Sequence, residues 1–182
     1  MKTLAIALIV LMVAPISSAA TSSNVAADEY EIKAAIYVNL LRLVDWPADK
    51  RGDISSPIVI GVSGSDDMAR ALEAIAQSKS VSVGRRIVVR RISGIVELDE
   101  CHSVFVGGGD RKRMEAALQT LGASPVLTVG EDERFVGLGG MIDLLLKEDR
   151  VRIEVNLDVL RNAGLTISSQ LLKIAVVKTG GK

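Results

Sequence analysis

Cys101 and His102 have the most obvious catalytic chemistry in this chain, because a thiol beside an imidazole base is a common nucleophile. Each residue type occurs once in the 182 residues. The pair precedes an apolar run typical of a strand, and adjacent side chains of a strand point to opposite faces, where they cannot share a proton. A serine triad would have to use the same histidine, and a zinc-type cluster lacks ligands. We therefore expect no enzyme activity, no catalytic residue, no metal and no cofactor.

A single cysteine also limits redox chemistry. An internal disulfide cannot form, because Cys101 has no partner in the chain. We expect Cys101 to lie buried at the start of a strand, as free cysteines often do. A disulfide between the Cys101 thiols of two copies, which would give a homodimer, is the alternative.

Two loops contain residue types that could hold a small ligand. Each is predicted to link a strand to the start of a helix, where backbone amides can bind an anion. The residues are Ser63, Gly64 and Ser65 in the first loop, and Gly107, Gly108 and Gly109 in the second. In a doubly wound sheet both loops lie at the carboxyl edge, where ligands bind. For the second loop we favour an ordinary turn in which Asp110 caps the helix with its own carboxylate, and the first loop has the same two interpretations.

Charged runs are further candidate surfaces. Arg85-Arg86 and Arg90-Arg91 flank or lie within a predicted strand. They could bind an acidic partner, or form a solvated edge that discourages strand pairing between molecules. The acidic residues of 97–100 and 131–133 lie in predicted loops and are interpreted as solvated surface, so no acid–base pair is identified.

The elements that must position these loops alternate along the chain. A helical pattern begins at Glu29 and ends before Pro47. Apolar, β-branched runs predict strands at residues 58–62, 87–92, 103–106 and 126–129. Helices are predicted at 67–77 and after Asp110. This order predicts an α/β fold, a three-layer sandwich with a largely parallel sheet.

The last third of the chain departs from this alternation. Runs 141–146 and 151–155 flank a charged turn and predict a C-terminal β-hairpin. Arg152 and Glu154 alternate with apolar residues, so we expect them on a solvated face. Helices are predicted at 157–163, ending at Gly164, and at 168–176, which would be the terminal helix.

The N-terminus has the pattern of a secretory signal peptide. Lys2 precedes an apolar run at residues 4–14, and small residues follow up to Ala20. The run, about eleven residues, is too short to span a bilayer. We therefore expect a signal peptide (1–20), a flexible leader (21–28) and one domain (29–177), exported without membrane insertion after cleavage.

Composition narrows the partners. With 22 basic and 22 acidic residues, the chain has no general attraction for nucleic acid or anionic lipid, so we expect neither as a partner. At 48% apolar residues it can bury an ordinary core.

Several stretches, taken in order, resemble the YfiR-like periplasmic proteins. They are residues 33–38, 45–47, 58–62, 72–75, 101–106, 125–129, 139–142, 155–157, 161–165 and 168–172. The resemblance covers nearly the whole predicted mature chain. Within it we identify a structural motif of Trp46, Pro47, Gly139, Gly140, Asn156, Arg161, Gly164 and Ser168.

The resemblance implies a function in the periplasm. Such a protein would bind the periplasmic sensor region of a membrane-bound diguanylate cyclase and repress it, which lowers cyclic di-GMP and with it biofilm formation. Relatives with redox-tuned activity resemble carriers of cysteine pairs, and the lone Cys101 departs from that pattern. A small-molecule-binding module linked to a sensor or uptake system is the alternative function.

Overall fold

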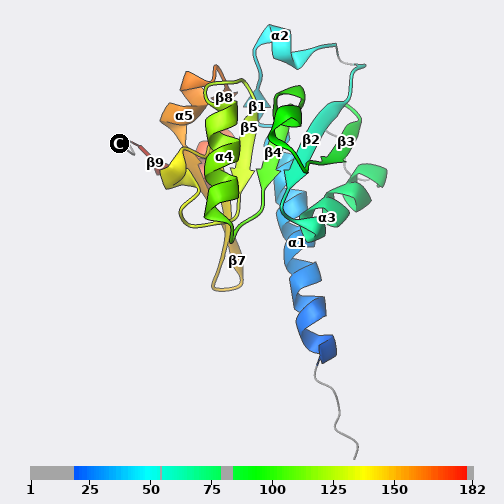
Figure 1. Cartoon of the computed structure of the whole chain (residues 1–182). Helices are drawn as coiled ribbons and strands as arrows, with labels where there is room; N and C mark the ends of the chain where they lie inside the picture. Colours follow the sequence, from blue (N-terminus) through cyan, green and yellow to red (C-terminus); the bar gives the residue numbers. More distant parts are fainter. Residues whose placement is uncertain (1–18, 54, 79–83, 180–182) are drawn as a thin grey trace, which may run out of the picture.

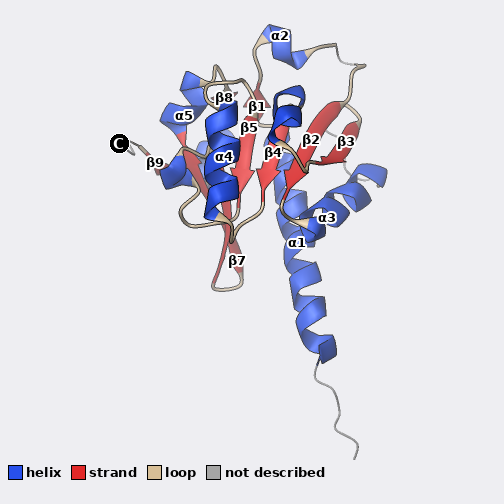
Figure 2. Ribbon diagram, viewed as in Figure 1, coloured by secondary structure: helices blue, strands red, loops and turns tan. Residues whose placement is uncertain are grey.

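The computed structural model describes residues 19–53, 55–78 and 84–179, so most of the predicted signal peptide lies outside the described residues. Within these residues a seven-stranded sheet has the order β3-β2-β4-β5-β6-β7-β9 (Figures 1 and 2). Its strands are β2 (Ile58–Ser63), β3 (Ile87–Arg91), β4 (Ser103–Val106), β5 (Leu127–Gly130), β6 (Ile142–Lys147), β7 (Arg150–Asn156) and β9 (Val176–Lys178).

Helices cover both faces of this sheet (Figure 2). They are α1 (Ala19–Leu41), α2 (Ala48–Arg51), α3 (Asp66–Gln77), α4 (Arg111–Leu121), α5 (Leu157–Asn162) and α6 (Ser169–Ile174), with 3-10 turns η1 (Ile95–Glu100) and η2 (Val136–Leu138). In the described part of the chain no helix is long and apolar enough to cross a bilayer.

The sheet is mostly parallel, as predicted. Strands β3, β2, β4, β5 and β6 pair in parallel, whereas β6 and β7 form the predicted antiparallel hairpin. Glu148 and Asp149 take positive φ angles of 50° and 58° at its turn, as a tight hairpin requires. The three-layer α/β prediction is therefore confirmed.

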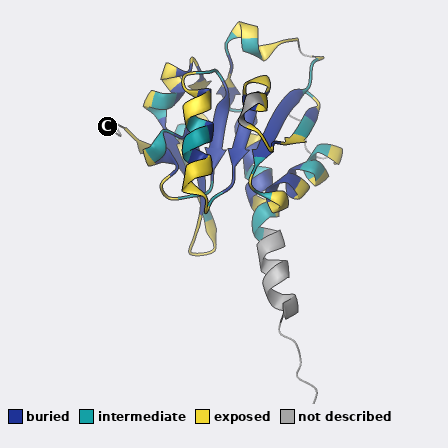
Figure 3. Cartoon of the chain, viewed as in Figure 1, coloured by how far each residue is buried: buried dark blue, intermediate teal, exposed yellow. Residues whose placement is uncertain are grey.

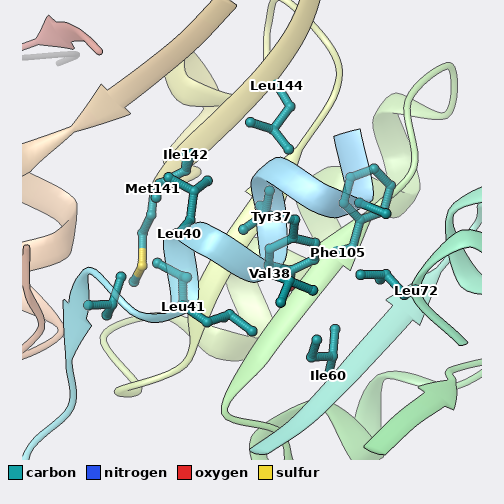
Figure 4. Close-up of a cluster of buried hydrophobic side chains, with 14 of the residues drawn as sticks. Tyr37, Val38, Leu40, Leu41, Ile60, Leu72, Phe105, Met141, Ile142 and Leu144 are labelled. Atoms are coloured by element: carbon teal, nitrogen blue, oxygen red, sulfur yellow. The ribbon is translucent and has the colours of Figure 1, made fainter. Parts of the chain in front are cut away.

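Alternating side chains divide the core between the two faces. Ile60 and Phe105 pack under α1 and α3, whereas Val59 and Val104 pack under α4. The strands of the sheet are mostly buried in Figure 3, and Figure 4 shows Tyr37 and its neighbours on α1 pointing at β2 and β4.

A buried hydrogen bond fixes the position of α1. The Tyr37 hydroxyl lies 2.6 Å from Ser103 Oγ, which donates to the Leu127 carbonyl at 2.8 Å. Burial raises the pKa of Tyr37 far above its usual range. The helix is thus held to two central strands by a satisfied polar chain as well as by apolar packing.

Several predicted boundaries are wrong. Helix α1 begins at Ala19 rather than Glu29 and ends at Leu41, and Val44–Asp45 forms a short strand, β1, paired with β8 (Thr166–Ile167). The loop after Pro47 contains α2. The C-terminal helix stops at Ile174, because residues 176–178 add β9 in parallel to β7.

Candidate functional site

The two predicted ligand loops meet between β2 and β4, where the strand order of the sheet reverses. The chain leaves β2 through α3 toward β3, and leaves β4 through α4 toward β5, so the loops after β2 and β4 lie side by side. The Gly107 amide donates to the Ser63 carbonyl at 2.8 Å. A Cβ on Gly107 would collide with the Gly64 carbonyl oxygen. Backbone contact therefore closes the space between the loops.

Carboxylates of the chain itself occupy the amides of the second loop. Gly108 N donates to Glu131 Oε1 at 3.3 Å, and Gly109 N donates to Asp132 Oδ2 at 3.4 Å. Asp110 caps α4 by accepting from the Arg113 amide at 3.0 Å. The position where an anion would bind is thus already filled, as the turn interpretation of this loop predicts.

Glu131 belongs to a network that joins this loop to α1. Lys33 Nζ lies 2.8 Å from Glu131 Oε2 and 2.6 Å from Glu29 Oε1, and the Tyr30 hydroxyl donates to Glu131 Oε1 at 3.2 Å. The Glu131 side chain is only 9% exposed, so interpreting this acid as solvated surface was wrong. Lys33 and Glu131 are 98 positions apart in the chain, and α1 places the two side chains in contact.

The pKa values of Lys33 and Tyr30 in this network are both raised. Burial lowers the pKa of Lys33, but hydrogen bonds to Glu131 and Glu29 outweigh it and leave the pKa above the usual value. Burial, followed by the Glu131 charge, raises the pKa of Tyr30. Asp132 is different, because the Arg134 guanidinium holds the pKa of its carboxyl far below the usual range.

The first loop borders a groove instead. One cavity of about 230 Å³ reaches from Ser63 to Leu98 and Ala117. An adjoining cavity of about 350 Å³ is bordered by Ser65 and Arg91. Both are lined by four shared residues, Gly64, Ile92, Ser93 and Arg113. We call these two cavities together the arginine groove.

The backbone at Gly64 favours glycine, because its φ of +77° lies in the left-handed region. The guanidinium of Arg113 lies directly against this glycine, in the space that a Cβ would occupy. Arg113 comes from the first turn of α4, so the first loop and that helix line the groove together.

A buried acid lies on the neighbouring strands. Asp143 is 0% exposed, and within the described residues neither of its carboxylate oxygens has a hydrogen-bond partner. It pairs in register with Glu154 of β7, which was predicted to be solvated but is buried. Burial, and then the charge of Glu154, raise the pKa of Asp143 to about 7, against the opposing effect of nearby backbone amides.

Cys101 and His102 have separate partners. Cys101 is buried, its pKa is raised by burial, and its thiol lies 3.7 Å from the Glu97 carbonyl. His102 Nδ1 accepts from the Val59 amide at 3.1 Å, and burial lowers its pKa. The imidazole nitrogen Nδ1 is therefore occupied by a backbone amide. No group of three or more potential metal-ligating side chains occurs in the described residues.

The residues of the family motif take structural positions. Trp46, followed by Pro47 at the N-cap of α2, donates from Nε1 to the His102 carbonyl at 3.0 Å. Asn156 caps α5 by accepting from the Val159 amide at 3.2 Å, and its Nδ2 lies 3.5 Å from the Val136 carbonyl. Ser168 caps α6 in the same manner.

Glycines of the same motif allow turns and close packing. Gly139 and Gly164 have φ angles of +101° and +72°. A Cβ on Gly140 would enter the ring of Phe135, which is fully buried. Arg161 has an exposed side chain, and its carbonyl accepts from the Gly164 amide at 3.0 Å.

The paired arginines mark the edge strand β3. Arg85 donates to the carbonyls of Arg51 and Ser56, both at 2.7 Å, and so braces the loop before β2. Arg90 pairs with Glu100 at 2.8 Å. Of the arginines in these two pairs, Arg91 is the one that borders the arginine groove.

Comparison with known proteins relates this fold to a family and to solved structures. The YfiR/HmsC-like family model (DUF4154) matches residues 30–176. A conserved domain protein from Vibrio cholerae O1 biovar eltor aligns with a TM-score of 0.51 and 14% identity, covering 83% of this chain and 60% of that one. The ABC domain in complex with L-Trp from Streptococcus pneumonia gives a TM-score of 0.49 and 12% identity, covering 66% of this chain and 55% of that one.

This chain therefore spans less than two thirds of either solved protein. At 14% identity the likeness to the Vibrio protein shows the fold alone. The family match is the stronger result, because it extends from the middle of α1 to the start of β9.

Proposed function

Because this chain belongs to the YfiR/HmsC-like family, we propose that it binds the periplasmic sensor region of a membrane diguanylate cyclase and represses it. At family level these proteins are periplasmic regulators in cyclic di-GMP signalling rather than enzymes. The family match over residues 30–176 is the observation that carries the proposal. The signal-peptide pattern at the N-terminus supports the proposal, because a protein must be exported to bind a sensor region outside the cytoplasmic membrane.

Repression by contact is a matter of differential binding. A regulator that prefers the inactive conformation of its partner shifts the partner toward that conformation. To move a balance from about 1:99 to about 99:1, the preference must reach roughly 5.5 kcal/mol. Such a preference needs a specific interface, for which stable complexes bury roughly 800 Å² on each side.

Exposed apolar side chains are candidate anchors for that interface. Ile32 on α1 is 54% exposed, and Ile174 at the end of α6 is 66% exposed. Leu146 beside the hairpin turn and Val177 on β9 are also partly exposed. Full burial of one such aliphatic side chain against a partner would contribute roughly 1.5–3 kcal/mol to binding.

The test combines a genetic and a biochemical measurement. Deleting the gene should raise cyclic di-GMP, and the purified protein should capture the periplasmic region of a cyclase encoded nearby. Ile32→Glu and Ile174→Glu act as controls for each other, because they lie on different helices. The variant that loses capture while keeping its thermal unfolding midpoint identifies the contact surface. Unchanged cyclic di-GMP in the deletion strain would remove the repressor function.

A further inference from the structure

The arginine groove differs from the neighbouring loop because Glu131 and Asp132 bind that loop and not the groove. Glu131 and Asp132 cap the amides of Gly108 and Gly109, whereas the loop at Gly64 borders a cavity of about 230 Å³. A cavity of this size holds about seven or eight waters at ~30 Å³ each, or a small organic molecule. It lies beside the switch point of the sheet, where doubly wound folds bind ligands.

The two arginines of the groove are not equally engaged. Arg91 contacts Asp66 at 2.7 Å and Glu73 at 3.2 Å, so two carboxylates satisfy it. Arg113 has a single longer ion pair, 3.4 Å to Asp110, in the part of the chain that the structure describes. Its guanidinium carries five N–H donors in a planar fork that fits a carboxylate. Arg113 is therefore the cation with donors to spare for a ligand.

The rest of the lining defines what else a ligand must contain. Ile92, Leu98 and Ala117 are buried apolar residues that line the cavity. Ser93 and Ser63 add hydroxyl groups. The carboxylates of Asp66 and Asp110 lie at the arginines and would repel a second negative charge. This combination favours a monoanion with a short apolar body over a phosphate dianion.

We propose that the arginine groove is a binding site for a small monocarboxylate, with Arg113 pairing with the carboxylate and Ile92, Leu98 and Ala117 contacting its apolar body. The site is independent of the proposed repressor function, because binding is measured on the isolated protein. Failure of either proposal leaves the other standing.

The test is a titration of the purified protein with 3-methylbutanoate, with 3-methylbutanamide as the neutral match and inorganic phosphate as the dianion. Calorimetry gives affinities, and amide NMR shifts of Gly64 and Ser93 locate the ligand. We expect the carboxylate to bind at least about tenfold more tightly than the amide, and phosphate to bind more weakly than the carboxylate. A charge-assisted hydrogen bond has that magnitude.

Two variants assign the binding to the groove. Arg113→Met should weaken carboxylate binding about 10–100-fold. Arg111 lies two residues earlier in the same helix and pairs with Glu115, so Arg111→Met should change the affinity less than about twofold. Equal affinity for acid and amide, undiminished binding by Arg113→Met, tighter binding of phosphate, or no saturable binding of the carboxylate would overturn the proposal. If Arg113→Met fails to fold, the acid and amide comparison on the unaltered protein decides.

Discussion

Replacing the buried acid by its amide, Asp143→Asn, should remove the loss of stability that ionisation of Asp143 causes as the pH rises. Asp143 faces Glu154 on β7 and lies near Asp132 after β5, and both of those acids are bound by basic residues of their own. Its pKa of about 7 compares with 3.8 for an unperturbed aspartate. The native state therefore holds a proton that the unfolded chain has already released.

The sign and size follow from this difference. Between about pH 4 and about pH 7 folding takes up one proton at this site, so the free energy of unfolding falls by about 1.4 kcal/mol per pH unit. The stabilising contribution is complete below the unfolded pKa and is lost as the pH rises through about 7. Over the whole interval the loss is roughly 4 kcal/mol. An asparagine does not titrate and escapes it.

The assay is urea unfolding followed by fluorescence of Trp46, the single tryptophan, across that pH interval. The quantity of interest is the stability of Asp143→Asn minus that of the unaltered protein. It should increase by roughly 4 kcal/mol from about pH 4 to about pH 8. His102 acts in the opposite direction, because its lowered pKa favours folding at higher pH, but it is common to both proteins and cancels.

An exposed acid on the same hairpin provides the control. Asp149→Asn removes a carboxylate from the turn, where asparagine tolerates the φ of 58°. A stability difference for Asp143→Asn that stays constant with pH would refute the reasoning. It would mean that Asp143 is ionised in the native state and solvated or paired.

Three further changes test the packing around the loops. Lys33→Met should lower the free energy of unfolding by about 3–5 kcal/mol, because it leaves Glu131 buried without its cation; adding Glu131→Leu should recover part of the loss in urea unfolding, and a loss below about 1 kcal/mol would contradict a buried pair. Gly107→Ala should cost about 1–3 kcal/mol through overpacking, whereas Gly94→Ala, which meets open space, should stay within about 0.5 kcal/mol by the same measurement. Burial raises the pKa of Cys101, so thiol reagents should label it only as fast as the protein opens, and a disulfide-linked dimer on a non-reducing gel would contradict this.

The parallel core could be predicted because its signals are local. Residues 58–62 and 103–106 are apolar, β-branched runs that each lead into a capped helix, and both became central strands. The elements that were missed depend on distant pairing. Strand β9 has three residues and begins at Val176, the last residue of the stretch predicted as helix, and its pairing with β7 makes it a strand. Strands β1 and β8 each have two residues, too few for a periodic pattern.

The site was harder to predict than the fold. Glu131 and Glu133 stand in one acidic run, yet the Glu131 side chain is 9% exposed and pairs with Lys33, whereas the Glu133 side chain is 72% exposed and pairs with Lys147. No local pattern distinguishes them. Asp143 did have a signal, since a lone acid inside the apolar run 141–146 is unusual, and the predicted hairpin already placed it near Glu154.

Two loops with similar local sequence thus differ because of what folds against them. Glu131 and Asp132 follow β5 and accept from the amides of Gly108 and Gly109, so carboxylates of the chain itself fill the anion position after β4. Arg113 of α4 instead lies against Gly64, which places a cation beside the loop after β2. A fold that usually binds its ligand between these strand ends has that space closed by the Gly107 amide. The arginine groove, bordered by Gly64 after β2, Ser93 after β3 and Arg113 of α4, is therefore the place that we propose for a small monocarboxylate.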